Sequence, residues 1–140
     1  MRPPTLLDTG PLVAFLKRQD HLHSWALREL NEIEPPLLTC EAVLSEACFL
    51  LRHDVDGPGT VLALLRDGLV QIGFDLQAEI MALRRLLQRY RDRRISLADA
   101  CLIRMAELYV GGIVLTVDSD FRIYRMNGRQ IIPSRMPAGK

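Results

Sequence analysis

Five short apolar runs, separated by segments with helical patterns, are the sequence feature that most constrains the fold. The runs cover residues 5–8, 36–39, 69–74, 113–117 and 130–132. Continuous apolar runs of this length are typical of strands that are buried on both faces. Between them, apolar residues recur at helical spacing over about 11–17, 21–33, 41–53, 60–68, 76–91 and 97–109. This alternation predicts a three-layer α/β domain, in which a mostly parallel sheet of four or five strands has helices on both faces.

Size and composition fit one globular domain. The chain has 140 residues, of which 49% are apolar and 25% are charged. We expect the domain to span residues 1–133, and we expect the Pro- and Gly-rich segment 134–140 to form a flexible tail. The net charge of +1 provides no global attraction to nucleic acid, so any such attraction requires a local patch.

The sequence also bounds the compartment. We identify neither a signal peptide nor an apolar run long enough to span a bilayer, so no membrane partner is expected. The three cysteines, Cys40, Cys48 and Cys101, form no Cys-x-x-Cys pair, which argues against a disulfide framework or a zinc site. We therefore expect a cytoplasmic protein.

Four acidic residues occupy positions where acids are unfavourable. Asp8 ends the first apolar run, Asp118 follows the fourth, Glu46 lies among apolar residues of a predicted helix, and Asp99 begins another helix. A carboxylate removed from water costs several kcal/mol unless it is paired or ligated. The carboxyl ends of parallel strands share one edge of a sheet, so Asp8 and Asp118 should lie together. Glu46 should lie on or beside the face that packs against the sheet, because its helical neighbours are apolar.

Convergence of these acids would require a cation. Two like charges about 4 Å apart repel by about 4 kcal/mol at an effective dielectric constant near 20. Oxygen ligands without histidine or cysteine favour Mg²⁺ or Mn²⁺ over Zn²⁺. An acidic site that holds such an ion suits phosphoryl chemistry.

Each acid also has an ordinary explanation. Asp99 could be a capping-box acid behind Ser96, and Asp8 could be a turn residue before Thr9 and Gly10. Asp118 and Asp120 could belong to a plain polar turn. One shared site accounts for all the positions, whereas the separate explanations require four coincidences.

The segments around these acids resemble one protein family. LLDTGPLVAFL, SEACFLL, SLADACLIRMA and LTVDSDF resemble the PIN domain in order and spacing, and more narrowly the ribonuclease toxins of VapBC toxin–antitoxin systems. The resemblance extends from Leu6 to about Ile132. It implies a Mg²⁺- or Mn²⁺-dependent endoribonuclease that is usually dimeric and is inhibited by a small VapB-like antitoxin.

The resemblance also implies roles for individual residues. Asp8, Glu46 and Asp99 match the three acids that line the metal site of the family. Asp118 matches the acid of a Thr-x-Asp-x-x-Phe pattern, and Asp120 matches the acid that some members use instead. The candidate supporting polar residues are Thr9, Ser96 and Thr116.

Local arginines provide candidate contacts to an RNA backbone. Arg93 and Arg94 precede the Asp99 helix, and Arg122 and Arg125 follow Asp118. A solvated helix face is the alternative explanation for these arginines.

We expect in-line hydrolysis of an RNA phosphodiester bond. The alternatives are a housekeeping RNA-processing PIN nuclease without an antitoxin, and a catalytically silent PIN binding module.

Overall fold

Five short parallel strands form the central sheet of the computed structural model, which describes residues 2–139. The strands are β1 (Thr5–Leu7), β2 (Leu37–Thr39), β3 (Val70–Ile72), β4 (Ile113–Leu115) and β7 (Ser134–Arg135). Their order is β3-β2-β1-β4-β7, and each neighbouring pair is parallel. Leu6 and Leu7 of the central strand have no exposed surface, as expected for a sheet that is covered on both faces.

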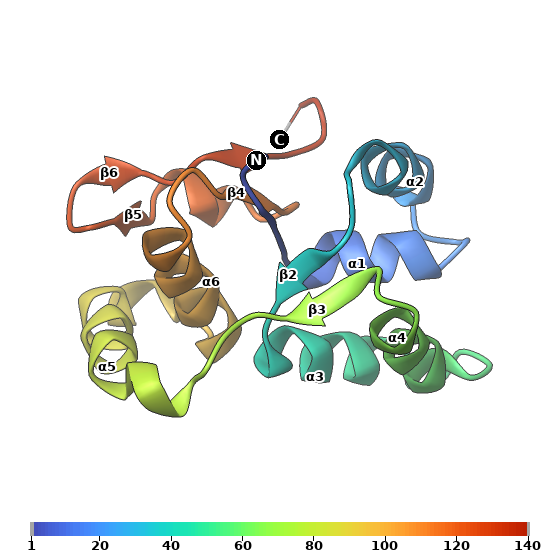
Figure 1. The fold of residues 1–140 in the computed structure, drawn as a ribbon, viewed down its shortest axis with the longest axis horizontal. Coiled ribbons are helices and arrows are strands. Elements are labelled where there is room, and N and C mark those ends of the chain that lie inside the picture. Colours follow the sequence, from blue (N-terminus) through green and yellow to red (C-terminus); the bar gives the residue numbers. More distant parts are fainter. Residues whose placement is uncertain (1, 140) are drawn as a thin grey trace.

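Six α-helices flank the sheet, so the predicted three-layer α/β fold is confirmed. They are α1 (Thr9–Leu16), α2 (His23–Glu32), α3 (Glu41–Leu50), α4 (Gly57–Arg66), α5 (Ile80–Arg89) and α6 (Leu97–Leu108). Along the chain, the strand order runs outward from β1 to β3 and then returns past β1 to β4. Because crossovers between parallel strands are right-handed, this reversal places the later helices on the opposite face. Accordingly, Figure 1 shows α5 and α6 on one side of the strands and α1, α2 and α4 on the other.

Three short 3-10 helices complete the helical structure: η1 (Gln77–Glu79), η2 (Arg91–Arg93) and η3 (Ser119–Arg122). Cys40, Cys48 and Cys101 are free thiols. Within residues 2–139, every helix is too short or too polar to cross a membrane.

The structure corrects the expected C-terminal tail. Ser134 and Arg135 form the fifth strand of the sheet, where Val114 N–H donates to Pro133 O at 2.9 Å and Thr116 N–H donates to Arg135 O at 3.1 Å. The free edge of β4 gains these hydrogen bonds from a segment without an apolar run, so hydrophobic patterning does not reveal the strand. The expected flexible segment 134–140 is therefore wrong for its first two residues, and the domain extends beyond 133.

The predicted strand at 130–132 is present in part, but it lies outside the main sheet. β6 (Gln130–Ile131) pairs antiparallel with β5 (Arg125–Met126) in a separate hairpin outside the main sheet. Ile131 remains 68% exposed, whereas Ile132 beyond the hairpin is buried in the core. The apolar run therefore marks the approach to the sheet rather than a central strand.

A candidate acidic active site

The paired ends of β1 and β4 bring together the first two acidic segments. Leu7 lies opposite Leu115 in the parallel register, and Asp8 N–H donates to Leu115 O at 3.0 Å. Beyond β4, the Thr116 hydroxyl donates to Asp8 Oδ2 at 2.6 Å, while Asp118 N–H donates to Thr116 Oγ1 at 3.0 Å. One buried threonine thus connects the two acids, as the parallel strand ends predicted.

The start of α1 adjoins the same point. Asp8 is the N-cap of α1, and its Oδ1 accepts the Thr9 N–H at 2.7 Å. Gly10 permits this approach, because a Cβ atom there would lie 2.3 Å from Val117 Cγ2. A side chain at position 10 would therefore require Val117 or the start of α1 to shift.

Glu46 reaches this region from α3, although not from a buried position. Its Oε1 accepts the Thr9 hydroxyl at 2.9 Å. The expectation that Glu46 lies on or beside the sheet-facing side is wrong: the side chain is exposed, and Val43, Leu44 and Ala47 are the buried residues of α3.

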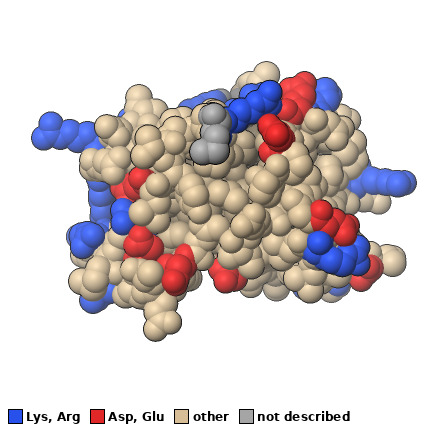
Figure 2. All heavy atoms as spheres, viewed as in Figure 1, with Lys and Arg blue, Asp and Glu red and all other residues tan. Residues whose placement is uncertain are grey.

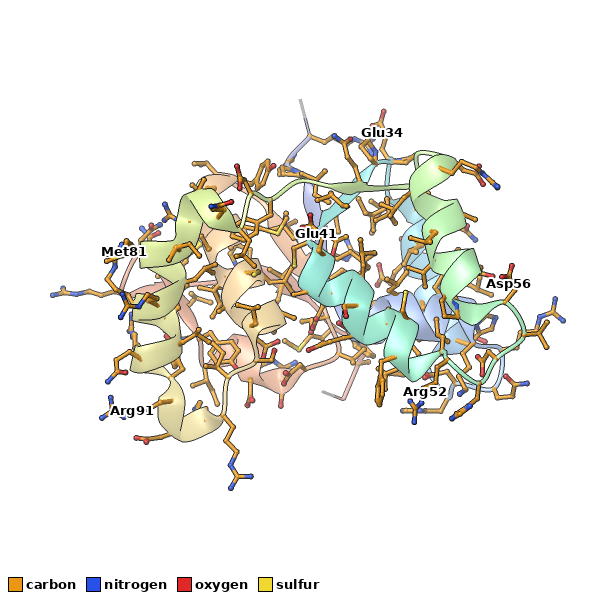
Figure 3. The ribbon with its side chains drawn as sticks, turned by 90° about the horizontal axis from the view of Figure 1, so that it is seen from below. Glu34, Glu41, Arg52, Asp56, Met81 and Arg91 are labelled. Carbon is orange, nitrogen blue, oxygen red and sulfur yellow. The ribbon has the colours of Figure 1, made fainter. Side chains whose placement is uncertain are left out.

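The reason is a second apolar surface on α3. Phe49 and Leu50 are 61% and 52% exposed, and with Ser45 and Glu46 they line a surface hollow of about 380 Å³. Figure 3 shows α3 between α6 and α4. The helix also packs against α1, and only the side with Phe49 and Leu50 is open to solvent. Apolar neighbours in the sequence therefore did not imply burial at this position.

Asp99 occupies the first turn of α6. Its N–H donates to Ser96 Oγ at 3.0 Å, which confirms Ser96 as the helix cap. The Asp99 carboxylate has a separate partner, because its Oδ2 accepts the Tyr124 hydroxyl at 3.0 Å. The sequence patterns did not single out Tyr124, which lies 25 residues further along the chain.

Electrostatics show that the four carboxylates act on one another. The pKa of Asp8 is raised to about 6, mainly by burial. Hydrogen bonds from Thr116 and Thr9 lower this pKa, and the charges of Asp118 and Glu46 add to the rise. Burial is also the main cause that raises the pKa of Asp99 to about 7. The charge of Asp8 is the next largest cause of this rise. The Tyr124 hydrogen bond lowers the pKa of Asp99, whereas the charges of Asp118 and Glu46 raise it by smaller amounts. We refer to Asp8, Glu46, Asp99 and Asp118 as the acid cluster.

Asp118 fits the fourth position of this cluster better than Asp120. Its charge contributes to the raised pKa of both Asp8 and Asp99. Asp118 Oδ1 also accepts the Asp120 N–H at 2.9 Å, which fixes the start of η3. Asp120 instead pairs with Arg93, with 3.4 Å between Oδ1 and Nη1.

The donor set suits a hard divalent cation, but the side chains do not form a complete cage. Within residues 2–139, no three His, Cys, Asp or Glu side chains converge closely enough to hold a metal ion as they stand. Asp8, Glu46 and Asp99 each direct at least one oxygen to a protein donor. Carboxylate oxygens have further acceptor capacity, and oxygen donors without histidine or cysteine are the ligands that Mg²⁺ and Mn²⁺ prefer.

The candidate arginines differ in their availability. Arg93, Arg94 and Arg122 are exposed on η2, η3 and the adjoining residues, and Arg93 pairs with Asp120. Arg125 is committed within the protein, because its Nη1 donates to the carbonyls of Arg122, Ile123 and Tyr124 at 2.7, 3.1 and 3.1 Å. Figure 2 shows further basic side chains along the edge formed by α5 and the β5–β6 hairpin, and the sequence identifies these as arginines.

Together, the parallel sheet and the acids at its carboxyl edge define an α/β domain with an acidic surface site. The PIN domain family model matches residues 5–126, and the chain belongs to the PIN domain family. It is 28% identical over 115 residues to Ribonuclease VapC26 of Mycobacterium tuberculosis (strain ATCC 25618 / H37Rv), covering 81% of this chain and 85% of that protein.

A solved structure has the same fold. The crystal structure of Mycobacterium tuberculosis VapC20, described as a sarcin–ricin loop cleaving toxin, superposes with a TM-score of 0.72. The two sequences are 23% identical, and the match covers 83% of this chain and 91% of the VapC20 chain. The resemblance to VapC-type PIN proteins that the sequence suggested is thus confirmed.

The raised pKa values predict how the stability of the metal-free protein depends on pH. Unfolding returns Asp8 and Asp99 from pKa values of about 6 and about 7 to the ordinary value of 3.8. Between about pH 4 and pH 7 the folded state binds more protons, so the free energy of unfolding falls as the pH rises. At about 1.4 kcal/mol per pKa unit, Asp8 alone should account for a loss of about 3 kcal/mol, measured by urea denaturation in EDTA.

The variant Asp99→Asn provides the matched test, because it keeps an acceptor for Tyr124 and removes the charge. We expect it to be more stable than the wild type near pH 8 and similar near pH 4. Asp67→Asn, at an exposed acid that pairs with Arg66, is the control. Its difference in unfolding free energy from the wild type should be the same near pH 4 and near pH 8. An Asp99→Asn protein less stable than the wild type near pH 8 would contradict the burial cost assigned to this carboxylate.

Proposed function

We propose that this protein is a Mg²⁺- or Mn²⁺-dependent endoribonuclease that hydrolyses RNA phosphodiester bonds and is the toxin of a toxin–antitoxin pair. The acid cluster at the carboxyl edge of the sheet is the observation on which the proposal rests. The similarity to Ribonuclease VapC26 supports RNA as the substrate. The similarity to the VapC20 structure supports the proposal in one further respect, because a protein described as a sarcin–ricin loop cleaving toxin has the same fold.

In this proposal, Asp8, Glu46 and Asp99 hold the cation, and Asp118 completes the negative site directly or through water. When bound, the cation supplies Lewis acidity and neutralises charge that develops during phosphoryl transfer. The chain itself orients the ligands: Thr116 and the Thr9 amide hold Asp8, and the Thr9 hydroxyl holds Glu46. The acids therefore approach an ion from fixed points on β1, α3 and α6.

Phosphate binding is assigned to the exposed arginines on η2, η3 and the adjoining residues. Arg93, Arg94 and Arg122 are exposed, and Arg93 forms only a half-exposed pair with Asp120. Such a pair contributes little stability, so a phosphate can compete for the guanidinium group. Arg125, a candidate from the sequence, instead supports the backbone of the Arg122–Tyr124 turn.

Partner proteins follow from the toxin assignment. The exposed apolar surface of Phe49 and Leu50 on α3 and Leu62 on α4 would be covered by a small VapB-like antitoxin or by a second copy in a homodimer. Without a partner, such a surface favours aggregation. Co-expression with the adjacent small open reading frame should yield a complex without nuclease activity, and a complex that remains fully active would contradict the antitoxin proposal.

The alternatives predict different results. A housekeeping PIN nuclease would cleave RNA without any antitoxin and without arresting growth. A silent binding module would bind divalent cations without cleaving any RNA. The acid at each of the four cluster positions favours an active enzyme over the silent module.

Replacement of Asp8 tests the catalytic proposal directly. Asp8→Asn keeps the side-chain size but removes one charged ligand, so RNA cleavage in Mg²⁺ should fall by more than about 100-fold, since even outer ligand partners contribute about 10- to 100-fold. Asp67→Asn should retain wild-type cleavage. Equal cleavage by wild type and Asp8→Asn would identify a contaminating nuclease and remove support for the mechanism.

Neutralisation of arginines tests the phosphate contacts. RNA binding is measured with the Asp8→Asn protein, which should not cleave, while the salt concentration varies. If Arg93 and Arg94 each contact one phosphate, their replacement by Gln should reduce the slope of log affinity against log salt by about 1.4. The double variant Arg18→Gln and Arg28→Gln, at exposed positions of the α1–α2 region, is the charge-matched control. An unchanged slope in the Arg93 and Arg94 variant would refute the assignment.

A further inference from the structure

Asp99 receives a hydrogen bond from a buried tyrosine that lies outside the acid cluster. The Tyr124 hydroxyl donates to Asp99 Oδ2 at 3.0 Å, and the Tyr124 residue is only 1% exposed. A buried hydroxyl without a partner would cost about 1 to 3 kcal/mol, so both groups favour this contact. One of the two Asp99 oxygens is thereby held at a fixed point.

The tyrosine ring has little freedom to move away from Asp99. It packs edge-on against Tyr90 and Phe121, with centroid separations of 4.9 and 5.2 Å. Its backbone N–H donates to Asp120 O at 2.9 Å, which ties the residue to η3. The hydroxyl is therefore held both by the aromatic packing and by the backbone of the turn that also contains Asp118.

We propose that Tyr124 is a positioning residue that presents Asp99 to the divalent cation. This inference rests on the proposed function, because it assumes that Asp99 is a metal ligand. Tyr124 holds Oδ2 and Ser96 holds the backbone N–H, so the Asp99 carboxylate has a fixed place in the first turn of α6. The hydrogen bonds within residues 2–139 leave its other oxygen, Oδ1, available as a ligand. Hydrogen bonds to ligating carboxylates orient them and strengthen metal binding.

Tyr90 provides a matched control within the same aromatic group. Its hydroxyl accepts the Arg125 N–H at 2.8 Å instead of contacting an acid. Tyr124→Phe and Tyr90→Phe therefore each remove one hydroxyl from adjoining rings, but only Tyr124→Phe releases a carboxylate of the acid cluster. Any effect of altered ring packing should be similar in both variants.

The test is a Mg²⁺ titration of the full chain near pH 8. Binding is measured by calorimetry and, independently, by the shift in melting temperature. Tyr124→Phe should raise the Mg²⁺ concentration for half-saturation by about 10-fold, within the range for partners of metal ligands. Tyr90→Phe should change it by less than about two-fold. A second measurement, RNA cleavage at saturating Mg²⁺, should restore Tyr124→Phe to nearly wild-type kcat, because the tyrosine does not contact the substrate.

The outcomes separate this inference from the proposed function. Wild-type Mg²⁺ affinity in Tyr124→Phe, or equal weakening in both variants, would overturn the positioning role and leave the nuclease proposal intact. A kcat that saturating Mg²⁺ does not restore would also overturn it. Absence of Mg²⁺ and Mn²⁺ binding by the wild type would overturn the proposed function and this inference together.

Discussion

Burial of carboxylates that also repel one another is the constraint on which the site depends. Asp8 follows the central strand and Asp99 begins a helix that packs against the sheet, so neither can withdraw without moving core residues. Burial and mutual charge raise the pKa of both groups to between about 6 and about 7. A fold that retains this cost without a compensating ligand would gain stability from losing the acids. The arrangement is understandable if a cation neutralises it.

Neutral donors make the cluster tolerable and give it direction. Thr116 and Thr9 donate to Asp8 and Glu46, and the backbone of Thr116 is held in turn by Arg135 O of the last strand. The C-terminal strand therefore supports the site, although it contains none of the acids. Tyr124 provides the corresponding donor for Asp99. Asp8, Glu46 and Asp99 are thus each oriented by a residue from another element, which makes the position of the cluster a property of the whole fold.

Strand polarity explains why part of this site could be predicted from the sequence. Asp8 and Asp118 follow apolar runs, and neighbouring parallel strands must bring their carboxyl ends together. Ser96 was predictable as a cap because capping uses only local spacing. Glu46 was placed incorrectly because apolar neighbours predict a buried face only when one face of the helix is apolar, and α3 has an exposed apolar surface as well. Tyr124 and the strand Ser134–Arg135 escaped prediction because each acts through long-range contacts without a periodic pattern.

The central claim is that the carboxylates of Asp8 and Asp99 are held together at an energetic cost that a divalent cation removes. Carbon-detected NMR titration of the side-chain carboxyl groups measures this directly, in EDTA and again with saturating Mg²⁺. We predict pKa values of about 6 for Asp8 and about 7 for Asp99 without the ion, and a clear fall of both when Mg²⁺ is present. Ordinary aspartate values near 3.8 in EDTA, or values that Mg²⁺ leaves unchanged, would contradict the account.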